Sequence, residues 1–281
     1  MEWRGRRGSG NIEDRRRMGG GGRAGVGGLG VVAVVLVGWF FGVDLTPLLQ
    51  EGGPATQSQP RELTAEDRAM GEFVSVTLAD TEEVWQTLFR DQVGQPYNPA
   101  TLVLFSGYTQ SGCGGASQAS GPFYCPVDGK VYLDTEFFRT LQDQLGAGGD
   151  FAAAYVIAHE IGHHVQDELG ILEQTTQMRQ SMSEADSNAV SVQVELMADC
   201  LAGVWANAAA AQFGSIEAGD IAEAMNAAAR IGDDTLQKNA GRSPVPDSFT
   251  HGSSAQRMRW FETGQQSGRI ETCDTFAATD L

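Results

Sequence analysis

Three residues in one short stretch, His159, Glu160 and His163, have the types and spacing needed for metal-assisted hydrolysis. Four positions along an α-helix turn about 400°, so the two imidazoles lie on one face and can bind the same ion. Glu160 follows the first histidine and can reach a metal-bound water as general base. Because catalytic zinc takes three protein ligands and keeps one position open, the pattern predicts a zinc site only if a third ligand exists.

The third ligand has two possible locations in the chain. A histidine ten residues after His159 would indicate a metzincin, but that position is Leu169. The alternative is an acidic residue on a following helix, as in gluzincins, and Glu195 meets this requirement. Asp199 lies one turn later on the same face, where it is predicted to accept the free ring N–H of a liganding histidine. The opposing interpretation, a solvated helix face, is disfavoured because acids among apolar neighbours usually have a partner.

The two remaining histidines have different expected roles. His164 projects about 140° away from His159 on the helix, so it is predicted to be structural or on the surface. His251 lies in the sequence Phe-Thr-His-Gly and could donate to the oxyanion of a tetrahedral intermediate. A plain polar loop residue is the alternative for His251.

The segments around these residues are mostly helical with few strands, which predicts an α+β fold. Asp150 is a typical N-cap for the helix that carries the two histidines, and Gly170 is a typical residue just beyond its end. Short strands are predicted at residues 101–105 and 130–134, and the second is the predicted edge strand that would align a peptide by β-augmentation. Further helices are predicted at residues 72–93, from about 135 to the glycines after residue 145, about 173–211, 217–230 and 253–263.

The chain has four cysteines, all in the region that follows residue 43. An even number of cysteines in an exported region indicates disulfides. Because Cys113 and Cys125 flank a glycine-rich loop, the expected pairs are Cys113 with Cys125 and Cys200 with Cys273. Four reduced thiols are the alternative for a cytosolic domain.

The N-terminal part differs chemically from the rest of the chain. Residues 1–23 contain seven Arg against three acidic residues, and residues 24–43 form an uncharged apolar run. Twenty such residues can cross a bilayer as a helix, and the positive-inside rule would keep residues 1–23 in the cytoplasm and the rest outside. A cleaved signal peptide lacks a clear cleavage site here, and a buried core helix would show a polar face. The sequence therefore predicts a single-pass membrane anchor.

The remaining chain fits one globular domain behind a linker. Residues 44–65 contain three prolines and are typical of a linker, which leaves residues 66–281 as the domain. The chain of 281 residues is 41% hydrophobic, enough for a sizeable core.

The formal charge of the chain is −17, which repels a phosphate backbone, so we do not expect nucleic-acid binding.

The chain resembles the YpfJ-type neutral zinc metallopeptidases, a family of bacterial membrane-anchored proteins. The resemblance rests on the motifs above and on the segments GPFYCPVDGKVYLD and VPDSFTHGSSAQRMRWF. The resemblance extends to the head WRGRRGSGNIEDRR and so covers nearly the whole chain. It implies His159, His163 and Glu195 as ligands of Zn²⁺ and Glu160 as the catalytic residue.

A second resemblance concerns the segment that starts at Thr250. It is similar to the Thr-His-Pro…Arg segment of membrane-associated gluzincin peptidases, with Gly252 in place of the proline. This similarity implies His251 as a catalytic donor and Arg257 as the partner of an acid near the site.

The predicted function is that of a membrane-anchored zinc-dependent endopeptidase, with a zincin-like, gluzincin-type domain outside the cytoplasm that acts on peptides or proteins. Two alternatives belong to other classes: an inactive anchored scaffold that binds zinc and a partner, and a zinc amidase for non-protein substrates of the cell envelope. The first is disfavoured because inactive relatives tend to lose the general base, and Glu160 is present. Only turnover on defined substrates separates the second from a peptidase.

Overall fold

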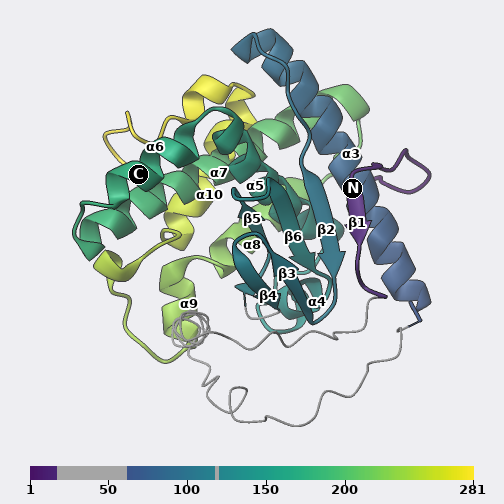
Figure 1. Ribbon diagram of the computed structural model, residues 1–281, viewed down its shortest axis with the longest axis horizontal. Coiled ribbons are helices and arrows are strands. Elements are labelled where there is room, and N and C mark those ends of the chain that lie inside the picture. Colours follow the sequence, from purple (N-terminus) through teal and green to yellow (C-terminus); the bar gives the residue numbers. More distant parts are fainter. Residues whose placement is uncertain (18–61, 118–119) are drawn as a thin grey trace.

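The computed structural model describes residues 1–17, 62–117 and 120–281 (Figure 1). Within these residues the chain is mostly helical with a small sheet, which confirms the predicted α+β class. Figure 1 shows the strands in the middle of the molecule, with α3 (Ala65–Leu88) along one side and the helices α6, α7 and α10 on the other.

The main sheet has four strands in the order β1-β2-β6-β5. The bounds are Ile12–Asp14 for β1, Thr101–Phe105 for β2, Lys130–Asp134 for β6 and Phe123–Cys125 for β5. The first three strands are parallel, and β5 pairs with β6 in the antiparallel sense. Both predicted strands are present, but the prediction that residues 130–134 form the edge was wrong, because β6 pairs on both sides and β5 lies at the edge. A separate hairpin joins β3 (Tyr108–Ser111) to β4 (Gly114–Ser117).

The helices follow the predicted segments with some changes at their ends. Thr64 caps α3 in a reciprocal capping box with Asp67, so this helix begins seven residues earlier than predicted and runs on as a π-turn to Val93. The segment predicted as mostly helix from 173 to 211 is broken at residues 180–183, where Ser183 caps a new helix. The remaining helices are α4 (Glu136–Asp143), α5 (Asp150–Glu168), α6 (Ile171–Arg179), α7 (Glu184–Phe213), α8 (Asp220–Arg230), α9 (Asp233–Asn239) and α10 (Ser254–Ser267).

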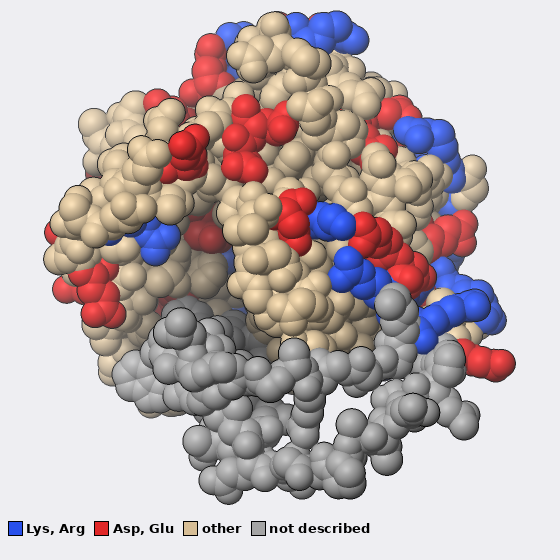
Figure 2. All heavy atoms as spheres, in the orientation of Figure 1, with Lys and Arg blue, Asp and Glu red and all other residues tan. Residues whose placement is uncertain are grey.

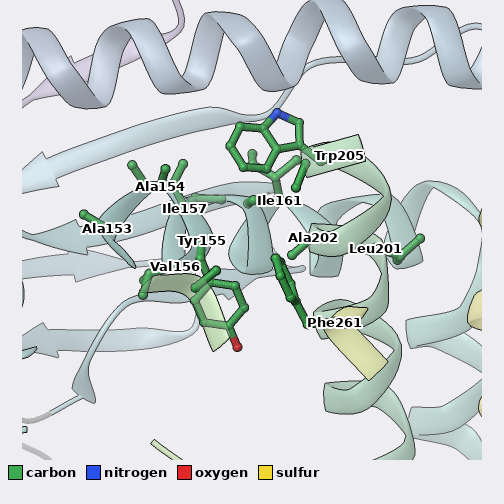
Figure 3. Close-up of a cluster of buried hydrophobic side chains, with 14 of the residues drawn as sticks. Ala153, Ala154, Tyr155, Val156, Ile157, Ile161, Leu201, Ala202, Trp205 and Phe261 are labelled. Carbon is green, nitrogen blue, oxygen red and sulfur yellow. The ribbon is translucent and has the colours of Figure 1, made fainter. Parts of the chain in front are cut away.

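Helix α5, which carries the two metal-site histidines, lies in the middle of the core. Its N-cap is Gly149, and Asp150 is the first helical residue, so the predicted cap is displaced by one position. Gly170 has a φ of 74° just beyond the helix end, as expected for a glycine at this position. Figure 3 shows Tyr155 and Ile161 of α5 together with side chains of α7 and α10 in one apolar cluster. Helix α5 is therefore held by apolar packing against α7 and α10.

Two disulfides join the cysteines in the predicted pairs. Cys113 is bonded to Cys125, which ties the β3–β4 hairpin to the edge strand β5. Cys200 in α7 is bonded to Cys273 near the C-terminal end of the chain. The second bond fixes the residue next to Asp199, and a disulfide typically stabilises a fold by about 2–4 kcal/mol.

The N-terminal residues 1–17 pack on the domain, which differs from the expected separate head. Ile12, Glu13 and Asp14 pair with Leu102, Val103 and Leu104 of β2, so the head supplies one strand of the main sheet. The predicted membrane helix itself, and most of the predicted linker, lie outside the described residues.

Within the described part of the chain, one helix is long and apolar enough to span a membrane. This helix is α7, and 78% of its most apolar window is buried inside the protein. It is thus a core helix, and its apolar character reflects packing against α5, α10 and α3.

Candidate metal centre

Two histidines and one carboxylate converge at the crossing of α5 and α7. His159 Nε2 lies 3.2 Å from Glu195 Oε2, and His163 Nε2 lies 3.5 Å from Glu195 Oε1. One ligand atom from each residue can be chosen so that all three lie within 4.8 Å of one another. The structure therefore brings together the three residues that the sequence predicted as metal ligands.

Each imidazole is oriented by a hydrogen bond from its other nitrogen. His159 Nδ1 donates to Asp199 Oδ1 over 2.8 Å, and His163 Nδ1 donates to Gln166 Oε1 over 2.8 Å. Both Nε2 atoms are then left as acceptors that face Glu195. Gln166 is itself fixed because its amide donates to the carbonyl of Val194 in α7. No role was predicted for Gln166 from the sequence, although its position three residues after His163 places it on the neighbouring turn.

Asp199 is completely buried and is surrounded by donors. Besides His159, it accepts hydrogen bonds from the Tyr155 hydroxyl at 2.5 Å and from Arg257 at 2.8 and 3.0 Å. Burial alone disfavours its charged form, but the guanidinium of Arg257 and the ring of His159 hold the pKa of Asp199 at about 2. This carboxylate therefore stays ionised and keeps His159 in one orientation.

Small residues let the helices approach closely enough to assemble the site. A Cβ on Gly162 would lie 3.0 Å from the Ala198 carbonyl oxygen, tighter than most Cβ contacts, so the glycine between the two histidines favours the close crossing with α7. Farther along α7 the approach to α10 is closer, because a Cβ on Gly264 would lie 1.9 Å from the Cys200 carbonyl oxygen. The first crossing brings Glu195 to the histidines, and the second brings Arg257 to Asp199.

Glu160 and the ligand residues line one cavity of about 400 Å³. Burial raises the pKa of Glu160 above its ordinary value, despite the neighbouring histidines. A carboxyl group of this kind is suited to accept and then release a proton. Much of the remaining wall is apolar and comes from Phe123, Phe137, Leu145, Val156, Leu172, Ile231 and Leu236.

His251 lines the same cavity from the loop before α10. The buried Asp233 holds this loop, because one of its oxygens accepts hydrogen bonds from the backbone N–H groups of Thr250, His251 and Gly252. Its other oxygen lies 3.3 Å from His251 Nδ1. Burial alone would lower the pKa of His251, but the carboxylates of Glu195 and Asp233 raise it above its usual value. The sequence did not identify Asp233, since only the folded chain brings residue 233 next to residue 251.

His164 has a structural position and takes no part in the ligand cluster. It is buried, its Nε2 donates to the Asn98 carbonyl over 2.6 Å, and its Nδ1 lies 3.2 Å from the Tyr124 hydroxyl. Tyr124 belongs to the edge strand β5, so His164 connects α5 to that strand. His164 was predicted to be either structural or on the surface, and the structure shows the structural role.

The donor set fits zinc. Two imidazole nitrogens and one carboxylate oxygen are the ligands of many catalytic zinc sites, and both imidazoles have the outer-shell partners that fix their tautomers. A second acidic group, Asp150, Asp220 and Glu223, is also compact, but the amino group of Met1 lies 2.8 Å from Asp150 and 3.2 Å from Asp220. An ammonium group therefore already lies between two of its three carboxylates.

Comparisons with known proteins agree with this donor set. A family model described as "Putative neutral zinc metallopeptidase" matches residues 1–276. The uncharacterized protein YpfJ of Escherichia coli (strain K12) is 47% identical over 98% of this chain and 99% of its own length. An uncharacterized protein of Mycobacterium tuberculosis is 42% identical over 74% of this chain and 71% of its own length. No solved structure matches the chain. The chain therefore belongs to the neutral zinc metallopeptidase family described by that model.

Proposed function

We propose that this protein is a zinc-dependent endopeptidase of the gluzincin type, with His159, His163 and Glu195 as zinc ligands. The observation that carries the proposal is that these ligands and Glu160 open into the same cavity as the edge strand β5. A general base, a metal donor set and a strand edge that can hold a peptide backbone are the three parts that peptide hydrolysis requires.

The chain's own residues supply the proton transfers. Zinc bound at this site would polarise the scissile carbonyl and make the attacking water more acidic. Glu160 accepts the proton of that water and delivers it to the nitrogen of the leaving amine as the C–N bond breaks. His251 lies on the same cavity and donates to the oxyanion that forms on the carbonyl oxygen. Asp199 and Gln166 hold the two imidazoles in place throughout.

The cavity wall favours a peptide over a glycan as substrate. Phe123 and Tyr124 of β5 line the cavity, and β5 pairs with β6 on one side only, so the other edge can bond to a peptide main chain. The apolar wall is suited to a large apolar side chain next to the cleaved bond. Both features favour a peptidase over a zinc amidase for non-protein substrates of the cell envelope.

The full-length chain, purified in detergent, tests the proposal. Metal analysis should find one zinc ion per chain, and a peptide library should show cleavage next to large apolar residues. Glu160→Gln, which leaves the ligands intact, is the matched control for a contaminating peptidase. A zinc-loaded protein that cleaves no peptide would favour the inactive scaffold, and cleavage of envelope amides alone would favour the amidase.

We also propose that the domain works outside the cytoplasm. The support is the pair of disulfides, since such bonds persist in oxidising compartments. A domain outside the cytoplasm does not require the single membrane crossing that the sequence predicts at residues 24–43.

A further inference from the structure

The outer face of α3 contains two acidic residues that are buried under the N-terminal head. Asp80 is 4% exposed and pairs with Arg6 over 2.5 Å. Glu82 is 7% exposed and accepts hydrogen bonds from the Ser9 hydroxyl and the Asn11 side-chain amide. Buried carboxylates need partners, and here the head supplies them.

Apolar and backbone contacts extend this interface. Trp3 is buried and packs edge to face on Phe73 of α3, with ring centroids 5.5 Å apart. The Ser9 N–H donates to the Ser75 carbonyl over 2.9 Å. A Cβ on Gly8 would lie 2.5 Å from the Ser75 hydroxyl oxygen, so the head and the helix are in close contact there.

The head then continues into the sheet. Strand β1 covers the edge of β2, whose residues Val103 and Leu104 are completely buried. Glu13 forms an ion pair with Lys130 of β6, and the guanidinium of Arg16 donates to the Asp67 carbonyl at the start of α3. In Figure 2, blue and red side chains alternate along the side of the molecule where Figure 1 places β1 and α3. Two of the arginines that suggested a cytoplasmic head, Arg6 and Arg7, thus pair with the acids Asp80 and Glu83 of α3. Arg15 and Arg16 pair with acids of the head itself.

From these contacts we infer that the face formed by α3 and the β2 edge is a binding surface for residues 1–17, and that the head and the catalytic domain occupy the same compartment. A head on the far side of a membrane would leave Asp80 and Glu82 without these partners and β2 as an open edge. The inference is independent of the proposed peptidase activity.

Two single-cysteine variants of the full chain test this inference in bacterial spheroplasts. Arg4→Cys places a thiol on an exposed position of the head, and Val245→Cys places one on a domain residue that is 53% exposed. The four natural cysteines are paired in disulfides and do not react. A membrane-impermeant maleimide should label both variants to the same extent, or neither until the cells are lysed.

Labelling of Val245→Cys with protection of Arg4→Cys would overturn the inference, as would the reverse. Lysis in a mild detergent gives the total reactive thiol for each variant, so a thiol shielded by the fold is distinguished from one shielded by the membrane. A thermal midpoint equal to that of the parent chain identifies variants that fold correctly. If one variant misfolds, Arg7→Cys or Met178→Cys, both at exposed positions, replaces it.

Discussion

Arg257 and Asp199 form a completely buried two-point ion pair behind the candidate metal centre. Arg257 Nε donates to Asp199 Oδ2 over 2.8 Å, and Nη2 donates to Oδ1 over 3.0 Å. The same Oδ1 accepts the Nδ1–H of His159. Because the guanidinium has a fixed planar geometry, it sets the plane of the carboxylate and, through it, the ring of His159.

Arg257→Lys should therefore weaken metal binding while the charge is kept. A lysine ammonium cannot make the two-point contact, so the Asp199 carboxylate can rotate and His159 loses its fixed orientation. We expect a 10- to 100-fold loss of zinc affinity, measured by competition with a chelator of known affinity. Arg259→Lys, two residues along α10 and exposed, is the matched control and should bind zinc like the parent. Unchanged affinity in Arg257→Lys would show that Arg257 does not position the site.

Gly162→Ala should destabilise the protein, although the same change in an ordinary helix stabilises it by about 1 kcal/mol. The added methyl group would lie 3.0 Å from the Ala198 carbonyl oxygen and would push α7 away from α5. We expect a loss of about 1–3 kcal/mol in the free energy of unfolding, together with weaker zinc binding because Glu195 moves with α7. Denaturant unfolding of the metal-free and zinc-loaded protein separates the two effects. A stability gain would mean that the crossing is looser than described.

The local parts of this site could be predicted from the sequence, and the long-range parts could not. His159 and His163 lie on one face because helical geometry fixes the angle between residues four positions apart. Asp233 has no such local signature, because it becomes a neighbour of His251 only when α9 meets the loop before α10. Gln166 lies on the turn next to His163, but its second contact, with the Val194 carbonyl, forms only when α5 meets α7. Their short-range surroundings resemble those of any polar residue on a helix.

The head illustrates the same limit for the fold. Its three-residue strand Ile12–Asp14 is too short for an alternating pattern, and its arginines have the density of a cytoplasmic flank. Only the acidic partners on α3, more than sixty residues away, distinguish an ion-paired head from a positive-inside signal. The disulfide pairs were predictable because a glycine-rich loop limits the partners of Cys113.

Glu160→Gln should bind zinc normally and lose nearly all turnover. The amide keeps the size of the side chain and leaves the three ligands unchanged, but it cannot accept the proton of the attacking water. We expect kcat to fall by at least about 10²-fold, measured on the best peptide from the library, with zinc content unchanged. Activity within a few-fold of the parent would exclude Glu160 as the base.

His251→Ala should lower kcat and kcat/KM together by about 10²–10³-fold, the size expected for the loss of one oxyanion donor. His251 is absent from the ligand cluster, so the zinc content should not change. Steady-state kinetics and metal analysis of the same preparation make the comparison. An increase in KM alone would indicate a role in substrate binding, and loss of zinc from a folded protein would indicate a metal ligand.

Arg6→Gln should destabilise the protein more at pH 8 than at pH 5. Burial raises the pKa of Asp80 to about 6 even with Arg6 beside it, so the folded protein holds this proton more tightly than the unfolded chain, and stability falls as the pH rises between about 4 and 6. Without the guanidinium the pKa of Asp80 rises further, and each further unit costs about 1.4 kcal/mol once the solution pH exceeds it. At pH 5 the carboxyl is already protonated in the folded state, and little more is lost.

Denaturant unfolding of parent and variant at both pH values measures this effect. The difference in unfolding free energy between the two proteins removes the contribution of every titrating group that they share. The expected excess loss at pH 8 is about 1–3 kcal/mol. Asp80→Asn removes the titrating group, so in that background Arg6→Gln should cost the same at both pH values. Two results would contradict the pairing of Arg6 with Asp80 in solution: a pH-dependent cost of Arg6→Gln in the Asp80→Asn background, or the same cost at pH 5 and pH 8 in the parent background. Either result would remove the main electrostatic support for the contact between the head and α3.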